Sequence, residues 1–599
     1  MKSILQELSS RVVDALKQVH AGGDPLVRAS QDEKFGDYQS NCAMGLAKKL
    51  GRKPRELAGV IVGNLQIDDM CEPLEIAGPG FINFRIKPAY LARGLEQIPP
   101  AGTSEGDRLG IARAVKPEVV VVDLSSPNLA KEMHVGHLRS TVIGDCVARV
   151  LEFAGHTVHR ENHVGDWGTQ FGMLVAHLRH VRPDVIAHPD SLVIGDLESF
   201  YVEAKARFDA DDDFKKESRD TVVALQKGDA QTRRIWKAFC DESLRHCHAI
   251  YDRLGVRLVD RGESFYTERM EELVRKLETM RQEGPQSPVR DSEGALCVFM
   301  DVFKTQDGGP LPLIVRKSDG GFNYATSDLA TILHRVKELQ ATRLIYVVGL
   351  PQKLHFEMLF AAIRQLRWVG DEVSLQHLGF GSMLASSGKP FRTREGGTVK
   401  LKDLLDEAVS RAREVVKGQL ADETAPARAF SHEQIDAIAE TVGLAAIKHF
   451  DLSHSLAGDY KFDLDTMLAL EGNTAPYMLY ANARIKSIAR KAGVDFEAAP
   501  ADVSIVLEHP AEISLAKKIL QFADVFDVVS RELRPNVLTE YLYELAKEFS
   551  RFYDKKLGVR VIDASPETVR LSRLRLCDLT SRTLKLGLSL LGIETLEQM

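Results

Sequence analysis

The sequence predicts a multidomain α/β protein: a parallel-sheet domain with a helical insertion lies between an α+β N-terminal module and an all-α C-terminal bundle. Three observations support this fold class. The four consecutive valines at residues 119–122 have the continuous apolar character of a buried parallel strand. A helical period begins soon afterwards, at Leu138. From about residue 460 the patterns are helical to the end of the chain.

At 599 residues the chain has room for about three or four domains. We place the N-terminal module at residues 1–112, the sheet domain at residues 113–460, and the C-terminal bundle at residues 461–599. The helical insertion occupies residues 180–260, approximately, within the sheet domain.

Composition is that of an ordinary globular protein, with 44% hydrophobic and 27% charged residues. No apolar run approaches the roughly 18 residues of a membrane span, and the first residues form an amphipathic pattern rather than a secretory signal. Seven scattered cysteines, an odd number, argue against a disulfide framework and favour a reduced, cytoplasmic protein. The net charge of −7 does not indicate nucleic-acid binding, so such a ligand would need local basic patches.

The N-terminal module contains a glycine–proline turn at residues 78–80 that opens an alternating strand at residues 81–86. Phe81 lies on this strand and also fits a core position. The basic run at residues 48–55 is compatible with either a solvated helix end or a phosphate contact. Residues 107–116 form a polar linker to the valine strand.

The turn after the valine strand concentrates polar chemistry. It carries Asp123, Ser125, Asn128, Lys131, His134, Gly136 and His137. A strand, a glycine-containing turn and a helix N-terminus form an anion site in an α/β fold. The glycine leaves room for a nucleotide, and the histidines offer donors to phosphate oxygens. The alternative is that the histidines merely cap the helix.

A polar, glycine-rich loop at residues 160–172 contains His163 and Asp166. These residues fit either substrate contact or a structural turn held by Trp167. Residues 196–208 and 220–254 are helical, with an acidic hinge at 209–213, which predicts the insertion. The nearby His246-Cys247-His248 run does not predict zinc, because adjacent ligands on a helix diverge.

Strands are predicted again at residues 295–300, 313–316 and 344–348, as the second half of the same domain. Tyr324 and Asp328, four residues apart at the start of a predicted helix, share one face. A phenol and a carboxylate suit a cationic substrate, because a carboxylate accepts two bonds from a guanidinium. The alternative is an acid that favours the helix dipole. Gln352 and His355 follow the last strand, where Gln352 equally fits a helix cap. Residues 400–413 form a plain amphipathic helix.

In the C-terminal bundle, Tyr477, Tyr480 and Arg484 lie on a helix with four basic residues and no acid after Tyr480. Aromatic rings beside cations suit an unstacked single-stranded loop of nucleic acid. The alternative is a core-packed tyrosine pair beside a solvated basic face.

Residues 134–137, His-Val-Gly-His, resemble the ATP-binding His-Ile-Gly-His element of class I aminoacyl-tRNA synthetases, in the form found in the arginyl-tRNA synthetase family. The resemblance covers nearly the whole chain, from Gly-Pro-Gly-Phe-Ile-Asn at residues 78–83 to the last residues. The Lys-Met-Ser-Lys-Ser motif of most class I enzymes is absent. Residues 388–394 instead resemble the loop of arginyl enzymes that lack it, with Lys389, Arg392 or Arg394 as the donor to pyrophosphate. In those relatives a lysine just upstream of the histidine element substitutes for the missing motif, and Lys131 occupies that place.

The resemblance implies a Rossmann-type catalytic domain, a tRNA-binding N-terminal module and an anticodon-binding bundle. It implies ATP-dependent activation of L-arginine and transfer to tRNA(Arg), with Mg²⁺ but no zinc or other protein-bound metal, in a monomer. The implied catalytic residues are Lys131, His134, Gly136, His137 and Lys389. The implied arginine contacts are Asp123, Ser125, Asn128, His163, Tyr324, Asp328 and Gln352. The implied ATP contacts are His134, Gly136, His137, His355 and Gly379, and the implied tRNA contacts are Phe81, Asn83, Tyr477, Tyr480, Arg484 and Met599.

Two alternatives stay open at this point. A class I synthetase for another amino acid, lysine above all, would also use Asp123 and Asp328, which disfavour an apolar substrate. A non-catalytic tRNA-binding relative would explain the missing Lys-Met-Ser-Lys-Ser motif, although His134, His137 and Lys131 argue against it.

Overall fold

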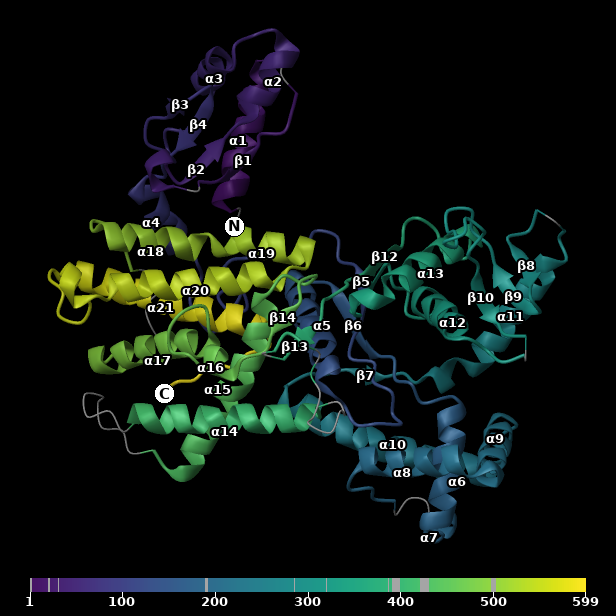
Figure 1. Cartoon of the computed structure of the whole chain (residues 1–599). Helices are drawn as coiled ribbons and strands as arrows, with labels where there is room; N and C mark the ends of the chain where they lie inside the picture. Colours follow the sequence, from purple (N-terminus) through teal and green to yellow (C-terminus); the bar gives the residue numbers. More distant parts are fainter. Residues whose placement is uncertain are drawn as a thin grey trace. The chain divides into compact units, whose positions relative to one another are not determined.

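The computed structural model describes residues 3–19, 22–30, 32–188, 192–284, 286–318, 320–385, 387–389, 391, 399–420, 430–496 and 503–599. The chain divides into two compact units (Figure 1). The terminal unit comprises residues 1–113, 412–453 and 467–599, and the central unit comprises residues 114–411 and 454–466. Helix α14 (Leu401–Leu420) begins in the central unit and ends in the terminal unit. The domain boundaries at residues 112 and 460 stay predictions.

A five-stranded parallel sheet forms the core of the central unit, in the order β12-β11-β5-β6-β7. Its strands are β5 (Val119–Asp123), β6 (Thr157–Asn162), β7 (Val259–Asp260), β11 (Arg343–Tyr346) and β12 (Ser374–His377). Val121 of β5 lies opposite Leu344 of β11 and His159 of β6. Because Val120, Val121 and Val122 are fully buried, the predicted parallel strand is confirmed.

The order of the strands reverses between β5 and β11. Helix α5 (Val135–Ala154) leads from β5 to β6, and α13 (Lys353–Gln365) leads from β11 to β12 at the opposite side of the sheet. Such a boundary leaves a crevice at the carboxyl ends of the strands, where open α/β sheets bind ligands. Helix α5 begins earlier than the predicted Leu138, because His134 caps it.

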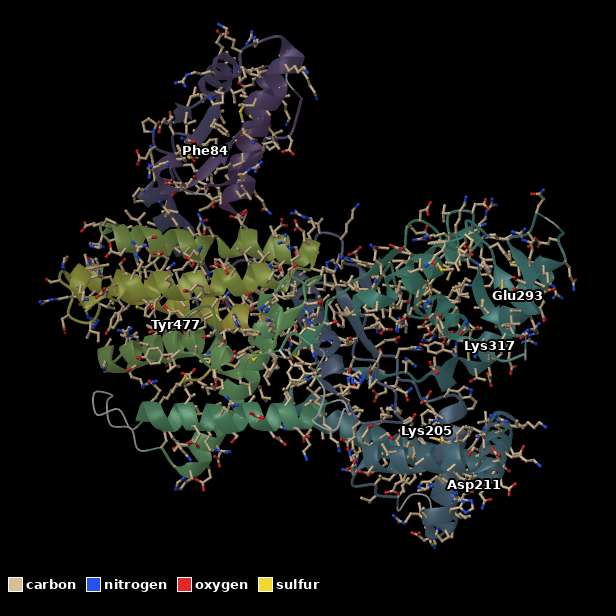
Figure 2. The ribbon with its side chains drawn as sticks, viewed as in Figure 1. Phe84, Lys205, Asp211, Glu293, Lys317 and Tyr477 are labelled. Atoms are coloured by element: carbon tan, nitrogen blue, oxygen red, sulfur yellow. The ribbon has the colours of Figure 1, made fainter. Side chains whose placement is uncertain are left out.

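The insertion consists of helices that Figure 1 shows gathered in one group: α6 (Thr169–Val181), α7 (Asp184–Ala187), α8 (Leu197–Ala210), α9 (Asp212–Gln226) and α10 (Ala230–Arg253). The predicted acidic hinge falls where α8 passes into α9, and Asp211 caps α9 by accepting a hydrogen bond from the Phe214 N–H (Figure 2). Asp229 caps α10 in the same way. The helix predicted across residues 220–254 is therefore interrupted before α10.

Strands β9 (Ala295–Val298) and β10 (Leu313–Arg316) occur where strands were predicted, but they do not extend the parallel sheet. They form a separate antiparallel sheet with β8 (Val289–Ser292). Parallel neighbours need a crossover of a dozen or more residues, whereas Glu293 and Gly294 alone join β8 to β9. Their φ angles of 51° and 80° are those of a tight hairpin turn. Helices α11 (Thr267–Arg281) and α12 (Tyr324–Lys337) share a hydrophobic core with this sheet and with β5 and β11.

The terminal unit begins with a four-stranded antiparallel sheet in the order β1-β2-β4-β3. Its elements are α1 (Ile4–Gln18), β1 (Val27–Ala29), β2 (Tyr38–Ser40), α2 (Cys42–Leu50), α3 (Pro54–Gly63), β3 (Glu75–Ala77), β4 (Phe81–Phe84) and α4 (Pro88–Glu96). The predicted strand is confirmed as β4, which ends at Phe84 (Figure 2). The C-terminal helices are α15 (His432–Ser453), α17 (Ala475–Ala492), α18 (Pro510–Leu520), α19 (Phe522–Glu532), α20 (Pro535–Phe552) and α21 (Glu567–Leu590).

The remaining elements are short: β13 (Met383–Leu384), β14 (Tyr460–Lys461), α16 (Leu464–Met467) and the 3₁₀ helices η1 (Glu33–Phe35), η3 (Glu263–Tyr266), η4 (Leu350–Gln352) and η5 (Lys555–Leu557). No helix in the described part of the chain combines the length and the apolar character that crossing a bilayer demands.

Candidate active site

A cavity of about 680 Å³ lies at the carboxyl ends of the parallel strands. It is at the boundary between β5 and β11, where the order of the strands reverses. The structure brings to this cavity sequence-predicted residues from four separate segments: Asp123, Ser125, Asn128, Gly136, His163, Tyr324, Asp328, Gln352 and His355. It also places Glu263 there, which the sequence did not predict.

The two histidines of the βα turn cap the helix and remain available as donors. His134 Nδ1 accepts a hydrogen bond from the Gly136 N–H at 3.0 Å, and His137 Nδ1 accepts one from the His134 N–H at 3.0 Å. Burial lowers the pKa of both imidazoles, that of His137 to about 3. Each ring is therefore neutral near neutral pH and carries its proton on Nε2, as a hydrogen-bond donor without a full charge.

Gly136 keeps the His134 ring in this position. A Cβ at residue 136 would lie 2.8 Å from Cε1 and 2.9 Å from Nδ1 of His134. The predicted reason for the glycine was room for a nucleotide, and the structure adds a second reason, room for the imidazole itself.

Ser125 and Ser126 form a strained turn directly after β5. Their φ angles are 67° and 51°, which are uncommon for residues with a side chain. Three elements hold the turn: the Ser125 N–H donates to Ser140 Oγ at 2.8 Å, Ser125 Oγ lies 2.8 Å from Tyr251 Oη, and the Ser126 N–H donates to Asn162 Oδ1 at 2.8 Å. Strain held by surrounding structure is typical of functional sites.

Tyr324 and Asp328 share one face of α12, as their spacing predicts. His355 Nε2 lies 2.6 Å from Asp328 Oδ2, and the ring of Tyr324 packs against the edge of the His355 ring at 4.8 Å. Tyr324 is 61% exposed, so its phenol reaches open space. A carboxylate and a phenol thus face the cavity together, as a guanidinium site requires.

Asp123 does not have the free carboxylate that the sequence suggested. Arg335 Nη2 of α12 donates to Asp123 Oδ2 at 2.6 Å, and Ser126 Oγ donates to Oδ1 at 2.9 Å. Arg335 is fully buried and also donates to Glu161 at 2.9 Å. This guanidinium of the protein already pairs with Asp123, so the structure shows an ion pair that the sequence did not reveal, and the contact of Asp123 with a substrate guanidinium stays a prediction.

Glu263 is the carboxylate that the sequence did not reveal. It begins η3 just after β7, and the described residues offer its side chain no hydrogen-bond partner. Burial, with the nearby carboxylates Asp166 and Asp328, raises its pKa to about 7. A strand of only two residues, β7, left no sequence pattern that placed Glu263 at the sheet edge.

The loop at residues 160–172 contains a structural turn and also lines the cavity, and its contact with substrate stays a prediction. Asp166 accepts hydrogen bonds from the N–H and Oγ of Ser264, and Trp167 packs edge-on against Trp236, as in a structural turn. His163 and Gly165 instead line the cavity.

The structure places Gln352, Gly379 and Lys389 as follows. Gln352 precedes α13 without a side-chain cap, so the structure gives no support to the capping alternative. Gly379 adjoins Phe380, which lines the cavity. Lys389 is exposed, and Arg392 and Arg394 lie outside the described residues.

The two histidines of the His246-Cys247-His248 run in the insertion contact oxygen atoms of the protein. His246 Nε2 lies 2.9 Å from the Ile194 carbonyl oxygen, and His248 Nε2 lies 2.7 Å from Asp260 Oδ2.

The predicted tRNA contacts lie in the terminal unit. On α17, Tyr480 is 47% exposed, Arg484 lies over the ring of Tyr553 at 4.9 Å, and Tyr477 Oη lies 3.1 Å from Ser550 Oγ (Figure 2). The last residues before Met599 run along the same helix, since Arg490 donates to the Glu597 carbonyl oxygen. On β4, Phe81 is half-buried, whereas Asn83 is 5% exposed and accepts a hydrogen bond from Gln39 Nε2 at 2.8 Å. Gln39 occupies Oδ1 alone, and Nδ2 of Asn83 is buried without a hydrogen-bond partner among the described residues, so a base contact would require this nitrogen to become exposed.

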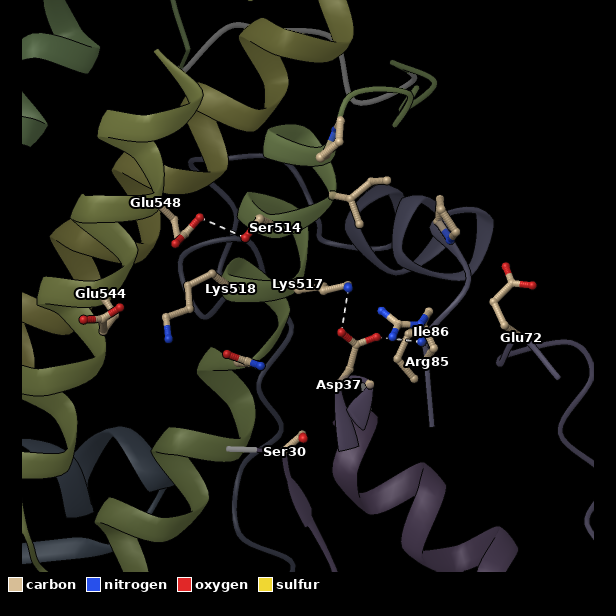
Figure 3. A pocket seen from close by; sticks show the side chains of 15 residues that line it. Ser30, Asp37, Glu72, Arg85, Ile86, Ser514, Lys517, Lys518, Glu544 and Glu548 are labelled. Atoms are coloured by element: carbon tan, nitrogen blue, oxygen red, sulfur yellow. Dashed lines mark hydrogen bonds and ion pairs between the residues drawn. The ribbon is translucent and has the colours of Figure 1, made fainter. Parts of the chain in front are cut away.

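A second cavity, of about 710 Å³, lies in the terminal unit between N-terminal loops and helices α18 and α20 (Figure 3). Its polar contacts include an ion pair, with Lys517 Nζ 2.6 Å from Asp37, and a hydrogen bond from Ser514 to Glu548 at 2.8 Å. The residues that line it are not among those predicted for the site. We therefore place the chemistry in the cavity of the central unit.

Comparison with known proteins agrees with this geometry. Family models match the arginyl tRNA synthetase N-terminal domain at residues 6–86, the class I (R) tRNA synthetase catalytic domain at residues 104–464, and the DALR anticodon-binding domain at residues 478–599. Arginine–tRNA ligases of Nostoc sp. and Synechococcus elongatus are 49% and 51% identical, over 99% and 97% of this chain and 98% and 96% of theirs.

Solved structures support the same assignment. Arginyl-tRNA synthetase from Plasmodium falciparum has a TM-score of 0.83 at 29% identity, and that from Thermus thermophilus has 0.79 at 25% identity. Both matches cover 100% of this chain and 100% of the other. With a family model over most of its length and relatives of about half-identical sequence along the whole chain, the protein belongs to the arginyl-tRNA synthetase family of class I aminoacyl-tRNA synthetases.

Proposed function

We propose that this chain ligates arginine to tRNA(Arg) in two steps. First, a carboxylate oxygen of arginine attacks the α-phosphorus of ATP, and the bond from the α-phosphorus to the oxygen that bridges to the β-phosphate breaks. The products are arginyl-adenylate and pyrophosphate. Second, a hydroxyl of the 3′-terminal ribose of tRNA attacks the arginyl carbonyl and AMP leaves. The observation that carries this proposal is one cavity in which an acidic pocket adjoins the capped N-terminus of α5. Because the substrates are those of translation, we place the reaction in the cytoplasm.

The arginine side chain is held by Asp328, Glu263 and Tyr324. Two carboxylates and a phenol suit the planar guanidinium, and their mutual repulsion is relieved when the cation binds. Asn128 Oδ1 already accepts hydrogen bonds from the Ala130 N–H and Gln170, so its amide NH₂ is directed to the arginine carboxylate. Ser125, His163 and Gln352 complete the contacts from the same cavity.

The phosphates of ATP bind at the N-terminus of α5. His134 and His137 donate through Nε2, and Lys131 adds a positive charge beside them, with Lys389 as a second donor. His355 and Gly379 face the adenosine. Because the reaction forms no covalent enzyme intermediate, positioning and charge neutralisation supply the catalysis.

Mg²⁺ enters as part of the substrate MgATP. The described residues contain no group of three or more His, Cys, Asp or Glu side chains that could hold a metal ion. The phosphates of ATP supply ligands to it, as is usual for this small, strongly hydrated ion.

The terminal unit binds tRNA. Exposed Tyr480 and the Arg484–Tyr553 pair offer a ring and a cation to unstacked bases and phosphates of the anticodon loop, with Tyr477 and Met599 alongside. Phe81 and Asn83 on β4 face a second, splayed-out base. We expect the enzyme to work as a monomer and to need bound tRNA before it activates arginine.

ATP–pyrophosphate exchange with each amino acid, with and without tRNA, tests the function. We expect exchange with arginine alone, in the presence of tRNA. Exchange with lysine would indicate a class I synthetase specific for lysine. No arginine-dependent exchange, with or without tRNA, would overturn the proposal.

Arginine binding is expected to weaken as pH falls, because Glu263 must be ionised to bind the guanidinium. Its pKa of about 7 means that most of the carboxyl is protonated about one unit below neutrality, so the KM for arginine should rise about tenfold between about pH 8 and pH 6. Steady-state exchange assays across this range measure the effect. Glu263→Gln should raise the KM at high pH and flatten the dependence.

The same raised pKa predicts the sign of a stability effect. Between the ordinary pKa of 4.5 and about 7, the folded protein binds a proton that the unfolded chain has released, so stability falls as pH rises through this window. Glu263→Gln should therefore stabilise the free enzyme by about 1–2 kcal/mol above neutrality. Glu268→Gln, at an exposed glutamate of α11, is the matched control. An unchanged KM for arginine in Glu263→Gln would contradict the proposal that Glu263 binds the guanidinium.

A further inference from the structure

Lys131 is in contact with the insertion. Its Nζ lies 4.4 Å from the ring centroid of Tyr201, a half-buried residue of α8. Lys131 itself is exposed on the βα turn, and its positive charge contributes to the lowered pKa of His134. The contact therefore joins a helix of the insertion to a cation whose charge acts on His134.

A second contact joins α8 to the same turn. Lys400 Nζ lies 3.0 Å from Oδ1 of Asp196, the N-cap of α8, and 3.2 Å from Oε2 of Glu132. Backbone hydrogen bonds bring Lys400 there, since the Val135 N–H donates to the Val399 carbonyl and the Leu401 N–H donates to the Met133 carbonyl. Lys400 thus fixes the start of α8 relative to the residue that follows Lys131.

The chemistry of the Lys131 contact suits a residue that must later bind phosphate. A carboxylate partner would neutralise the ammonium and occupy its N–H donors. An aromatic face attracts the cation through its quadrupole, typically by about 0.5–1 kcal/mol where it is exposed, and leaves donors free. The contact also restricts the long side chain of Lys131 in advance, so that less rotamer entropy is lost when ATP binds.

We propose that α8 of the insertion positions Lys131 for the first step, with Tyr201 holding its ammonium and Lys400 holding the helix against the turn. Tyr201 and Lys400 are positioning residues that act through Lys131. This inference rests on the proposed function, in which Lys131 neutralises charge on ATP, and it adds a role for the insertion.

Single substitutions measure the size of the effect in tRNA-dependent ATP–pyrophosphate exchange. Tyr201→Leu should lower kcat about fivefold, the equivalent of about 1 kcal/mol, and leave the KM for arginine unchanged. Tyr201→Phe, which keeps the aromatic face, should restore the rate. Phe208→Leu is the matched control, because it removes a similar contact on the same helix, between Lys205 Nζ and Phe208 at 5.4 Å.

A double-mutant cycle decides whether Tyr201 acts through Lys131. Tyr201→Leu should have no further effect in a Lys131→Met background, whereas a purely structural role would lower the rate equally in both backgrounds and overturn the inference. Lys400→Met should show the same dependence on Lys131, with Lys402→Met in the first turn of the following helix α14 as its control. If Lys131→Met alone leaves the rate unchanged while arginine exchange persists, the role of Lys131 fails and the positioning inference fails with it, but arginine activation stands.

Discussion

Replacing Arg335 with methionine is expected to destabilise the central unit by about 3–5 kcal/mol. The guanidinium has no exposed surface, and it donates to Asp123 at 2.6 Å and to Glu161 at 2.9 Å. Methionine keeps an unbranched apolar side chain but carries no charge, so buried Asp123 would lose its counter-ion and Glu161 would retain only Arg261 Nε at 3.3 Å. Calorimetry of the full chain should record a lower Tm for the transition of the central unit.

The contribution of this pair should also depend on pH. Arg335 holds the pKa of Glu161 below its ordinary value, in opposition to burial, which raises it. A depressed carboxyl pKa contributes stability above the pKa of the unfolded chain, and that stability is lost as pH falls through the folded value. The difference in Tm between wild type and Arg335→Met should therefore shrink in acid.

Arg269→Met is the matched control for Arg335→Met. Arg269 also makes a two-armed contact with a carboxylate, Glu338, at 2.9 and 3.0 Å, but both side chains are substantially exposed. Its removal should change stability by less than about 1 kcal/mol. Equal effects of the two substitutions would show that the buried pair has no special importance.

Local features of the fold were predictable from the sequence because short-range chemistry determines them. The valine strand β5 and the turn with His134 and Gly136 depend on residues adjacent in the chain, and both occur as predicted. The shared face of Tyr324 and Asp328 follows from helical spacing alone. These segments also supply most of the predicted residues of the cavity.

Features that depend on strand pairing were not predictable in this way. Glu263 reaches the cavity because β7 is the edge strand beside β6. A strand of two residues is too short to give a recognisable sequence pattern, so this pairing could not be predicted. Arg335 belongs to an ordinary amphipathic helix, and only the tertiary fold shows that it reaches the ends of β5 and β6. The sequence therefore did not reveal the ion pair of Asp123 with Arg335, since the position of Asp123 suited a substrate contact equally well.

The separate antiparallel sheet was also not predicted, because it depends on how the strands pair. Its strands have the apolar composition of parallel strands, so composition could not distinguish them from the core sheet. The connections decide, since the turn at Glu293 and Gly294 is too short for a crossover. Connection length was therefore the signal available in the sequence that the prediction did not use.

Asp328→Asn is expected to lower kcat/KM for arginine by about 10²–10³-fold, or about 3–4 kcal/mol. Asparagine keeps the shape of the side chain but removes the charge that faces the guanidinium beside Glu263 and Tyr324. The loss should appear in arginine activation, whereas the KM for ATP should change by less than about twofold, because the histidine turn is untouched. Citrulline, the uncharged analogue of arginine, should be affected far less, so the substitution should reduce discrimination between the two.

The neighbouring His355 makes a structural explanation of Asp328→Asn testable. His355 Nε2 lies 2.6 Å from Asp328 Oδ2, so the substitution also removes the charge of the group that His355 contacts inside the cavity. His355→Gln keeps a donor for Asp328 while it removes the ring, and it should retain most of the preference for arginine over citrulline. If His355→Gln and Asp328→Asn lost that preference equally, the pocket would owe its specificity to the pair. If only Asp328→Asn loses it, the carboxylate itself reads the positive charge of the substrate, and Glu263 alone cannot replace it because its raised pKa leaves it partly protonated at neutral pH.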